Sequence, residues 1–461
     1  MGSENADIAT AKAGDERMRM HAAAVRMAVI GVVTSIFTIG AGNVATVAAA
    51  AEIPTFTNEV APILYENCIV CHRAGENAPM SLVTYEETRP WSRSIKSKVL
   101  AGEMPPWHAD PAVGLFSNRR GLSDVERDTL VRWVDAGAPQ GDLAVLPPVP
   151  KFSDGWQIGT PDVVVEMQEA FAVPAEGEVA YQYFSAPTNF TEDKWVEAIE
   201  VRAGTPAAVH HVLVYARVPG ATRRPPGFKV IPVGERAKAV ARAREARARA
   251  RGRAVRPLSV GPGTLIGTLA PGTDPLVLEP GTAFHLAKDT QLVFQIHYTT
   301  TGETTTDRSR VGLMLADTRP EHEVRVGQFL NPYLEIPAGE ADQRVDALVE
   351  FTQDTAIHAL FPHTHVRGKR WEYEVVFPDG RREPVLSVPR YDFNWQTYYQ
   401  FDEPLLVPKG SRLAATAWYD NSLANKSNPD PTALVRWGDQ TWEEMHYTGV
   451  TYRVISHEAE E

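Results

Sequence analysis

Two cysteines and a histidine stand in the spacing Cys68-x-x-Cys71-His72, which is the motif that attaches a c-type haem. They are the only cysteines among the 461 residues. A CxxC pair also occurs in redox disulfides and as half of a zinc site, but zinc would require further cysteine or paired histidine ligands nearby. We therefore expect one covalently bound haem c, with both thiols bonded to the porphyrin and His72 bound to the iron.

The iron of an electron-carrying haem needs a sixth ligand, and a thioether suits that role. Met104 lies in Met104-Pro105-Pro106-Trp107, where the prolines stiffen the loop that would present it. A methionine in a loop is often only a packing residue. Met104 is predicted as the ligand because the haem requires a partner, and Met80 and His108 are the alternatives.

Five further histidines occur in pairs or late in segments with strand character. His210 and His211 are adjacent, His297 follows in a second segment, and His363 and His365 share one strand face because side chains alternate with a period of two. Imidazole ligates copper, zinc, iron or nickel, so ligand type alone does not select the metal. The alternative is that these histidines are hydrogen-bonded structural residues. Of the others, three are expected to be structural and four stay unassigned: His21, His322 and His457, then His108, His285, His358 and His446.

The haem motif requires helices to position it, and the sequence around it predicts them. Phe56, Val60 and Leu64 recur at helical spacing just before Cys68. Ser123-x-x-Glu126 has the pattern of a capping box at the start of a second helix. These signals predict a small all-α cytochrome c domain over 53–142, followed by a proline-rich linker over 143–158.

The remaining histidines lie in a region rich in β-branched and aromatic residues, with glycine and proline between the segments. Predicted strands include 162–167, 211–216, 291–298, 371–377 and 412–418. Short strands at this density are typical of jelly-roll sandwiches. The predicted fold class is therefore multidomain, with the cytochrome c domain followed by two all-β jelly-roll-like sandwiches over 159–310 and 311–461.

The N-terminal segment 1–51 combines arginines with a following apolar stretch and small residues, as in a secretory signal peptide or an uncleaved anchor. Haem c is attached outside the reducing cytosol. We expect a periplasmic or secreted bacterial protein that meets the membrane only through this segment. The net charge of −12 argues against a nucleic-acid partner.

Four short motifs occur in the order found in one known family. They are His210-His211, Gln295-x-His297-Tyr298, His363-x-His365-x-x-Gly368-Lys369 and Glu444-Met445. In this order they resemble the type II copper, ascorbate-dependent monooxygenases, the family of peptidylglycine α-hydroxylating monooxygenase and dopamine β-monooxygenase. The resemblance covers roughly 160–452. It also indicates which histidines belong to the same site.

The resemblance implies two copper ions. His210, His211 and His297 would hold the electron-transfer copper, while His363, His365 and Met445 would hold the copper that binds O₂ and catalyses the reaction. A soft thioether favours Cu(I), the state that meets O₂. The implied activity is hydroxylation of a C–H bond in a small organic substrate, with the haem as electron relay and a redox protein or small reductant as the source.

Two departures from the family's peptide hydroxylase bear on the substrate. Phe361 and Gly449 stand where that enzyme has an arginine and a tyrosine, so a peptide carboxylate would lose both partners. An electron-transfer protein without oxygen insertion is the alternative function, and a haem enzyme such as a peroxidase is a third. A run of arginines over 236–256 lacks an apolar stripe, so it is expected to project into water, where it would dock an acidic partner or anionic lipid or would serve no function.

Overall fold

The computed structural model describes residues 52–76, 78–152, 155–218, 227–252, 262–271 and 273–455. The predicted signal peptide or anchor, 1–51, lies outside the described residues, and so do 253–256 of the arginine run. Ile53–Glu461 forms one compact unit. Within the described ranges, no helix has the length and apolar character needed to cross a bilayer.

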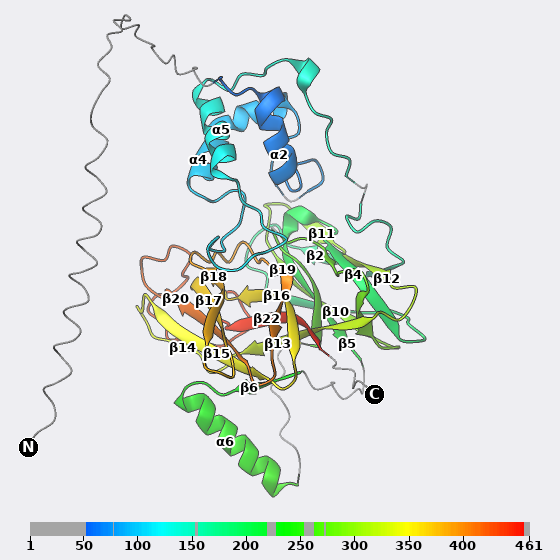
Figure 1. Cartoon of the computed structure of the whole chain (residues 1–461), viewed down its shortest axis with the longest axis vertical. Coiled ribbons are helices and arrows are strands. Elements are labelled where there is room, and N and C mark those ends of the chain that lie inside the picture. The colour runs from blue at the N-terminus through cyan, green and yellow to red at the C-terminus, as the bar shows by residue number, and fades with distance from the viewer. Residues whose placement is uncertain are drawn as a thin grey trace, which may run out of the picture. The chain divides into compact units, whose positions relative to one another are not determined.

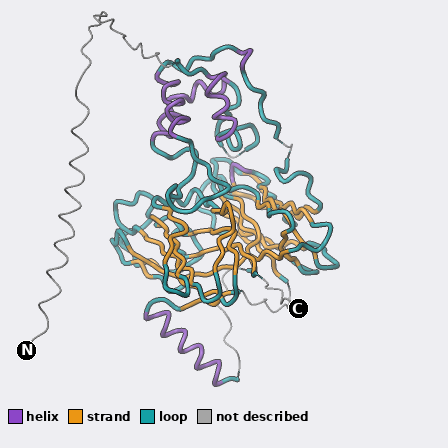
Figure 2. The backbone as a smooth tube through the Cα atoms, in the orientation of Figure 1, coloured by secondary structure: helices purple, strands orange, loops and turns teal. Residues whose placement is uncertain are grey.

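Short helices make up the regular structure before the first strand (Figures 1 and 2). Capping boxes at Thr84 with Glu87 and at Ser123 with Glu126 satisfy the first backbone N–H groups of two of them. Phe56, Leu64, Leu130 and Trp133 form the centre of their shared apolar cluster. The elements are η1 (Phe56–Val60), α2 (Ala61–Asn67), α3 (Tyr85–Thr88), η2 (Arg89–Trp91), α4 (Ser92–Leu100), α5 (Asp124–Asp135) and η3 (Leu143–Val145).

The first sandwich packs the β1-β12-β4-β9 part of a nine-stranded sheet against the four-stranded sheet β3-β10-β5-β7. Val196 and Ile199 from one sheet meet Val212 and Phe294 from the other in its buried core. Its elements are β1 (Val163–Glu166), β2 (Phe171–Val173), β3 (Gln182–Pro187), β4 (Lys194–Arg202), η4 (Pro206–Ala208), β5 (Val209–Arg217), β7 (Thr264–Leu269), β8 (Leu276–Val277), β9 (Thr282–Leu286), β10 (Gln291–Tyr298), β11 (Thr305–Asp307) and β12 (Arg310–Leu315).

The second sandwich packs the β13-β22-β16-β19 part of the same nine-stranded sheet against the five-stranded sheet β18-β17-β20-β15-β6. Leu360 and Tyr452 meet Trp371 and Leu413 in its core. Its strands are β6 (Phe228–Ile231), β13 (His322–Leu330), β14 (Glu335–Ile336), β15 (Gln343–Phe351), β16 (Thr355–His363), β17 (Gly368–Val376), β18 (Arg382–Val388), β19 (Tyr399–Val407), β20 (Arg412–Tyr419), β21 (Val435–Arg436) and β22 (Tyr447–Val454).

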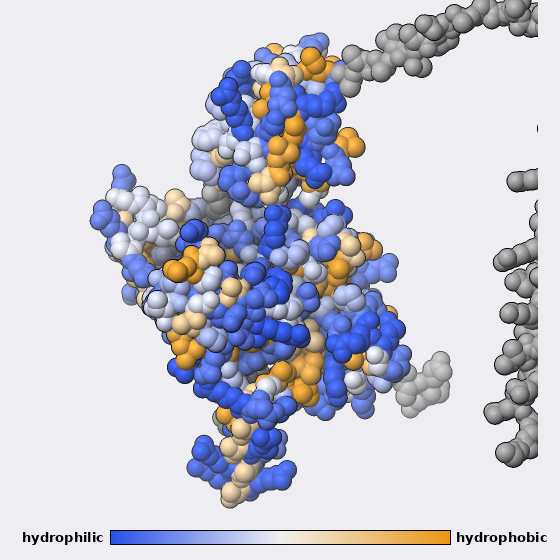
Figure 3. Space-filling model, turned by 90° about the vertical axis from the view of Figure 1, so that its left-hand side faces the viewer, coloured by the Kyte–Doolittle hydropathy of each residue, from blue (hydrophilic) through white to orange (hydrophobic). Residues whose placement is uncertain are grey.

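The arginine run forms helix α6 (Glu235–Ala250), which buries only Ala237. Most of its arginines are exposed, and the space-filling view shows blue hydrophilic side chains on either side of a band of pale orange ones (Figure 3). A helix without an apolar stripe cannot form a second core. The expectation that this segment extends into solvent holds only in part, because Ala241 and Arg244 are half-buried beside Ala237 and line a pocket against the second sandwich.

The predicted fold class is wrong in its separate all-α cytochrome c domain. The helices are short, and the segment after Met104 leaves them to pack against the second sandwich, where Ala109 joins the buried core with Trp107 and Phe116 against it. The two sandwiches are also not separate bodies, because β9 and β13 pair in parallel and make one sheet continuous through both. Local periodicity predicts helices and strands but carries no information on such long-range pairing.

Candidate metal centre

Neighbouring strands bring His210, His211 and His297 together. One possible ligand atom from each ring lies within 4.8 Å of the others. His211 pairs with His297 across β5 and β10, whereas Tyr298 pairs with Val209, so His210 is the extra residue of a β-bulge. Adjacent residues in a regular strand point to opposite faces, and the bulge removes that constraint. Both members of the pair therefore reach the same point as His297.

Each ring of this triad has a nitrogen atom that is free to bind an ion. The Nδ1 atoms of His210, His211 and His297 are buried and have no hydrogen-bond partner. On the other side of the ring, Nε2 of His211 lies 3.3 Å from the hydroxyl of Tyr181. Burial lowers the pKa of His297 to about 4, so its ring is neutral at pH 7. Neutral imidazoles with buried free nitrogens fit a metal ion.

His363 and His365 form a second set at the end of β16. Their ring centroids are 5.3 Å apart. Nδ1 of His363 donates to Oε1 of Gln396 at 2.6 Å, and Nδ1 of His365 donates to the carbonyl of Glu443 at 3.2 Å. These bonds fix the tautomer with Nε2 free to act as a ligand, and Nε2 of His365 is buried without a partner.

Glu444 ties the third predicted ligand of this set, Met445, to the histidines. Its buried carboxylate accepts from the backbone N–H groups of His365 at 2.8 Å, Arg367 at 2.7 Å and Met445 at 3.2 Å. Burial raises the pKa of Glu444 to about 7 although these hydrogen bonds and the Arg367 charge act against it. The carboxylate thus joins the turn after β16 to the residues that precede β22.

The loop 391–398 contacts both sets of histidines. The ring of Phe393 stacks on His210 at 5.6 Å and meets His365 edge-on at 6.0 Å, measured between centroids. Asn394 hydrogen-bonds His210, and Gln396 accepts from His363 as described above. Through Phe393 and Gln396 the loop therefore contacts residues of both sets.

Apolar and aromatic side chains surround Met445. They belong to one buried cluster drawn from both sandwiches, which includes Tyr215, Leu330, Phe361 and Tyr447. Phe361 pairs with Gly449 across β16 and β22, and a Cβ at Gly449 would lie 3.1 Å from the Cβ of Phe361.

The haem motif follows α2. Both thiols are free, and burial raises the pKa of Cys68 to about 12. Nδ1 of His72 donates to the carbonyl of Met80 at 3.3 Å, which leaves Nε2 available for iron. Two free thiols beside an oriented histidine fit the covalent attachment of haem.

The structure places the three candidates for the sixth iron ligand differently. The backbone of Met80 lies beside His72, and its side chain packs on the helical cluster. His108 lies near Asp392 and Arg390 of the second sandwich, and burial lowers its pKa. Met104 is half-buried and follows the end of α4. This placement does not choose between the three, and Met104 stays a prediction.

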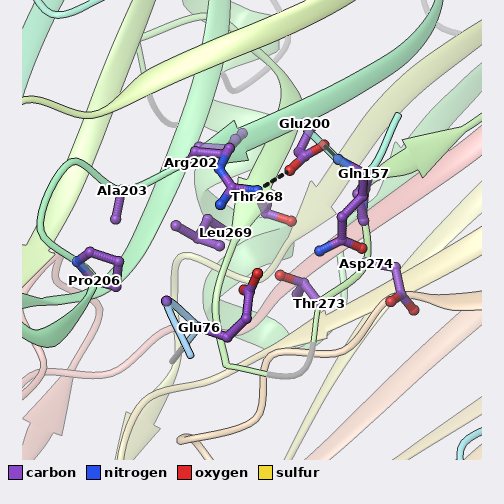
Figure 4. A pocket seen from close by; sticks show the side chains of 13 residues that line it. Glu76, Gln157, Glu200, Arg202, Ala203, Pro206, Thr268, Leu269, Thr273 and Asp274 are labelled. Carbon is purple, nitrogen blue, oxygen red and sulfur yellow. Dashed lines mark hydrogen bonds and ion pairs between the residues drawn. The ribbon is translucent and has the colours of Figure 1, made fainter. Parts of the chain in front are cut away.

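A shallow pocket lies where the haem-motif segment meets the first sandwich. Glu76 faces Thr268, Thr273 and Asp274 across it, and the ion pair of Glu200 with Arg202, 3.0 Å long, forms another wall (Figure 4). Its carboxylates are paired or lie toward solvent, and none of the predicted metal ligands lines it. The pocket therefore belongs to the junction and not to the metal centre.

Sequence reasoning missed Tyr181 and the roles of Phe393, Gln396 and Glu444. Tyr181 precedes β3 and carries no motif, so only the folded chain brings its hydroxyl to His211. Three unassigned histidines have structural partners. His446 packs on Trp371 with centroids 4.7 Å apart, His285 pairs with Asp193 at 3.1 Å, and His358 lies 3.7 Å from Glu279.

No protein-family model and no curated protein matches the sequence. Among solved structures, the major capsid protein P2 of bacteriophage PM2 is similar over 64% of this chain and 98% of that chain, with 11% identity and a TM-score of 0.28. The structure of infectious bursal disease virus, Gx strain, matches 69% of this chain and 76% of that chain, with 9% identity and a TM-score of 0.18. At such TM-scores neither similarity bears on the fold or the function.

Proposed function

We propose that the protein is a copper-dependent monooxygenase that hydroxylates a C–H bond of a small organic substrate with O₂. In this proposal a covalently bound haem c supplies the electrons, and the protein works in the bacterial periplasm or outside the cell. The observation that carries the proposal is the pair of buried histidine sets in which ring nitrogens lack any hydrogen-bond partner. Buried polar atoms are usually paired, and in the triad the unpaired ring nitrogens belong to side chains that converge on one point, as around a bound ion.

The residues present fit copper. His210, His211 and His297 would hold one ion through Nδ1, and His363 and His365 would hold the other through Nε2 together with Met445. A thioether in the second set favours Cu(I) over zinc or iron. When bound, the two ions would each store one electron, and the ion beside Met445 would offer open positions to O₂.

The residues around the second set support an uncharged substrate. Phe361 and Gly449 provide no ionic or hydrogen-bonding group, and Tyr447 donates its hydroxyl to Gln328 at 3.0 Å. An unpaired carboxylate in this apolar cluster would lose its hydration without a compensating partner. We propose small aromatic or aliphatic compounds as substrates and exclude peptides that are recognised by a terminal carboxylate.

The proposal is tested with protein that carries its haem and is loaded with copper. We expect two copper ions and one haem per chain, and O₂ uptake that depends on a member of a panel of small aromatic and aliphatic compounds. Changing Met445→Ala should abolish product formation and leave the haem spectrum intact. Met314→Ala, a partly buried methionine of β12, is the matched control. Product formation by the Met445 variant would contradict the assignment.

An electron-transfer protein without oxygen insertion is the second candidate. Met445 is only 8% exposed and is enclosed by the apolar cluster, which resembles a site that exchanges electrons more than one that admits a substrate. This candidate predicts the same metal content. It also predicts that O₂ uptake under reducing conditions is independent of every compound in the panel and yields no hydroxylated product.

A further inference from the structure

The segment 104–118, here called the strap, connects the haem-binding part of the chain to the metal centre. It begins at Met104 and runs along the second sandwich. Its backbone N–H groups at Asp110 and Ser117 donate to the carbonyls of Ser387 at 2.8 Å and Gln400 at 2.9 Å. Main-chain hydrogen bonds of this kind fix the strap on β18 and β19, the two strands that flank the loop 391–398.

Aromatic side chains continue from the strap to the second set of histidines. The ring of Trp107 in the strap contacts the ring of Tyr399, with centroids 5.2 Å apart. Tyr398, which precedes Tyr399 in the chain, stacks on Phe361 with centroids 4.5 Å apart. The ring of Phe361 is nearly parallel to that of His363, at 6.2 Å and 15°. Between Trp107 and His363, the covalent bond from Tyr399 to Tyr398 is the one step that is not a ring contact.

We propose that this series of side chains, Trp107, Tyr399, Tyr398 and Phe361, is the path by which electrons from the haem reach the His363, His365 and Met445 set. The inference rests on the proposed function. One electron moves in each transfer: a ferrous haem becomes ferric and a cupric ion becomes cuprous, while no protein bond forms or breaks and no proton moves. Electron transfer falls steeply with distance, so contacting rings and covalent bonds make the favoured route.

The triad of His210, His211 and His297 has no comparable connection to the strap. Among the described residues, its aromatic contacts are with Tyr181 and Phe393 and within the triad itself. The haem motif approaches the first sandwich through polar groups instead, where Arg120 pairs with Asp274 near Cys71. Electrons would therefore arrive at the second set without passing through the triad.

The test follows the haem optically in the full chain loaded with haem and cupric ions. Under anaerobic conditions a light pulse in the presence of a free flavin reduces the haem, and the decay of the ferrous absorption band reports transfer to copper. Freeze-quenched samples show by electron paramagnetic resonance which cupric signal is lost. Neither readout depends on turnover. Each variant is first checked for haem spectrum, copper content and unfolding temperature.

We expect Trp107→Leu and Tyr398→Leu to lose the fast phase of haem oxidation, whereas Trp107→Phe and Tyr398→Phe, which keep a ring in place, retain it. In the unaltered protein, the cupric signal of the second set should be lost before that of the triad. Fast decay in both leucine variants, or earlier loss of the triad's cupric signal, would overturn the path and leave the proposed function standing. Failure of any electron to leave the haem in the unaltered protein would overturn both.

Discussion

At the scale of single residues, the metal centre is defined by which nitrogen of each imidazole is already used. His297 has a free buried Nδ1 and a neutral ring, so replacing it with alanine should remove one of three ligands of its set. We expect His297→Ala to retain one copper ion per chain after desalting, measured by atomic emission. His285→Ala, which removes a histidine paired with Asp193 on the surface, should retain two. Equal copper in both variants would contradict the triad.

Tyr181 tests whether the partner of a ligand matters as well as the ligand. Its hydroxyl lies 3.3 Å from Nε2 of His211 and fixes the ring so that Nδ1 faces the triad. Loss of such a partner typically lowers metal affinity by about 10–100-fold. We expect that loss in Tyr181→Phe from competition with a copper chelator. Tyr183→Phe, which removes a hydroxyl of β3 that accepts from Gln295 of β10, should leave the affinity unchanged. Equal affinities in both variants would count against this role.

At the scale of elements, one carboxylate joins two segments that are far apart in the sequence. Glu444 accepts from three backbone N–H groups, and Glu444→Gln would turn an amide group toward donors and leave part of this set unsatisfied. An unsatisfied buried group costs about 1–3 kcal/mol, so chemical denaturation of the copper-free variant should show a loss of that size. Glu443→Gln, at a less buried neighbour, should be close to neutral. If Glu444→Gln leaves the free energy of unfolding unchanged, the hydrogen bonds of Glu444 are not needed for stability.

For helix α6 we expect the opposite result, because several of its arginines can be replaced together without a loss of stability. It buries Ala237 alone, and Arg242, Arg247 and Arg249 are exposed. Replacing Arg242, Arg247 and Arg249 together with glutamine should therefore change the free energy of unfolding by no more than about 0.5 kcal/mol for each site, in the range of surface substitutions. Thermal unfolding at fixed salt measures this. A cooperative loss would mean that the helix packs on a surface in solution.

The elements around the metal centre were predictable from the sequence to the extent that their signals are local. The capping box at Ser123 and Glu126 forms as predicted, and β10 and β20 fall on predicted strands. The β-bulge at His210 was not predictable, because a bulge depends on the register of two strands far apart in the chain. The grouping of the histidines came from the order of motifs and not from periodicity.

At the scale of the whole molecule, the sequence did not predict how segments far apart in the chain pack together in one sheet or one core. Its change of pattern after the linker suggested independent domains, whereas β9 and β13 join both sandwiches in one sheet and Ala109 of the strap lies in the second core. Composition cannot reveal this packing. A residue such as Ala109 has no local sequence signal that shows whether a distant strand will bury it or leave it exposed. The metal centre depends on the same long-range packing, since Phe393 and Tyr181 reach the histidines from different sandwiches.

This packing leads to a prediction about the haem. The strap is held by hydrogen bonds to β18 and β19, and all five histidines of the two sets lie on or beside strands. Copper binding should therefore not require the haem. We expect the double variant Cys68→Ala, Cys71→Ala to lose covalent haem, seen by haem staining after denaturing electrophoresis, and to keep two copper ions per chain. His211→Ala should give the reverse result, full haem with less copper. Loss of copper from the cysteine variant would show that the haem organises the strap, and through it the loop 391–398.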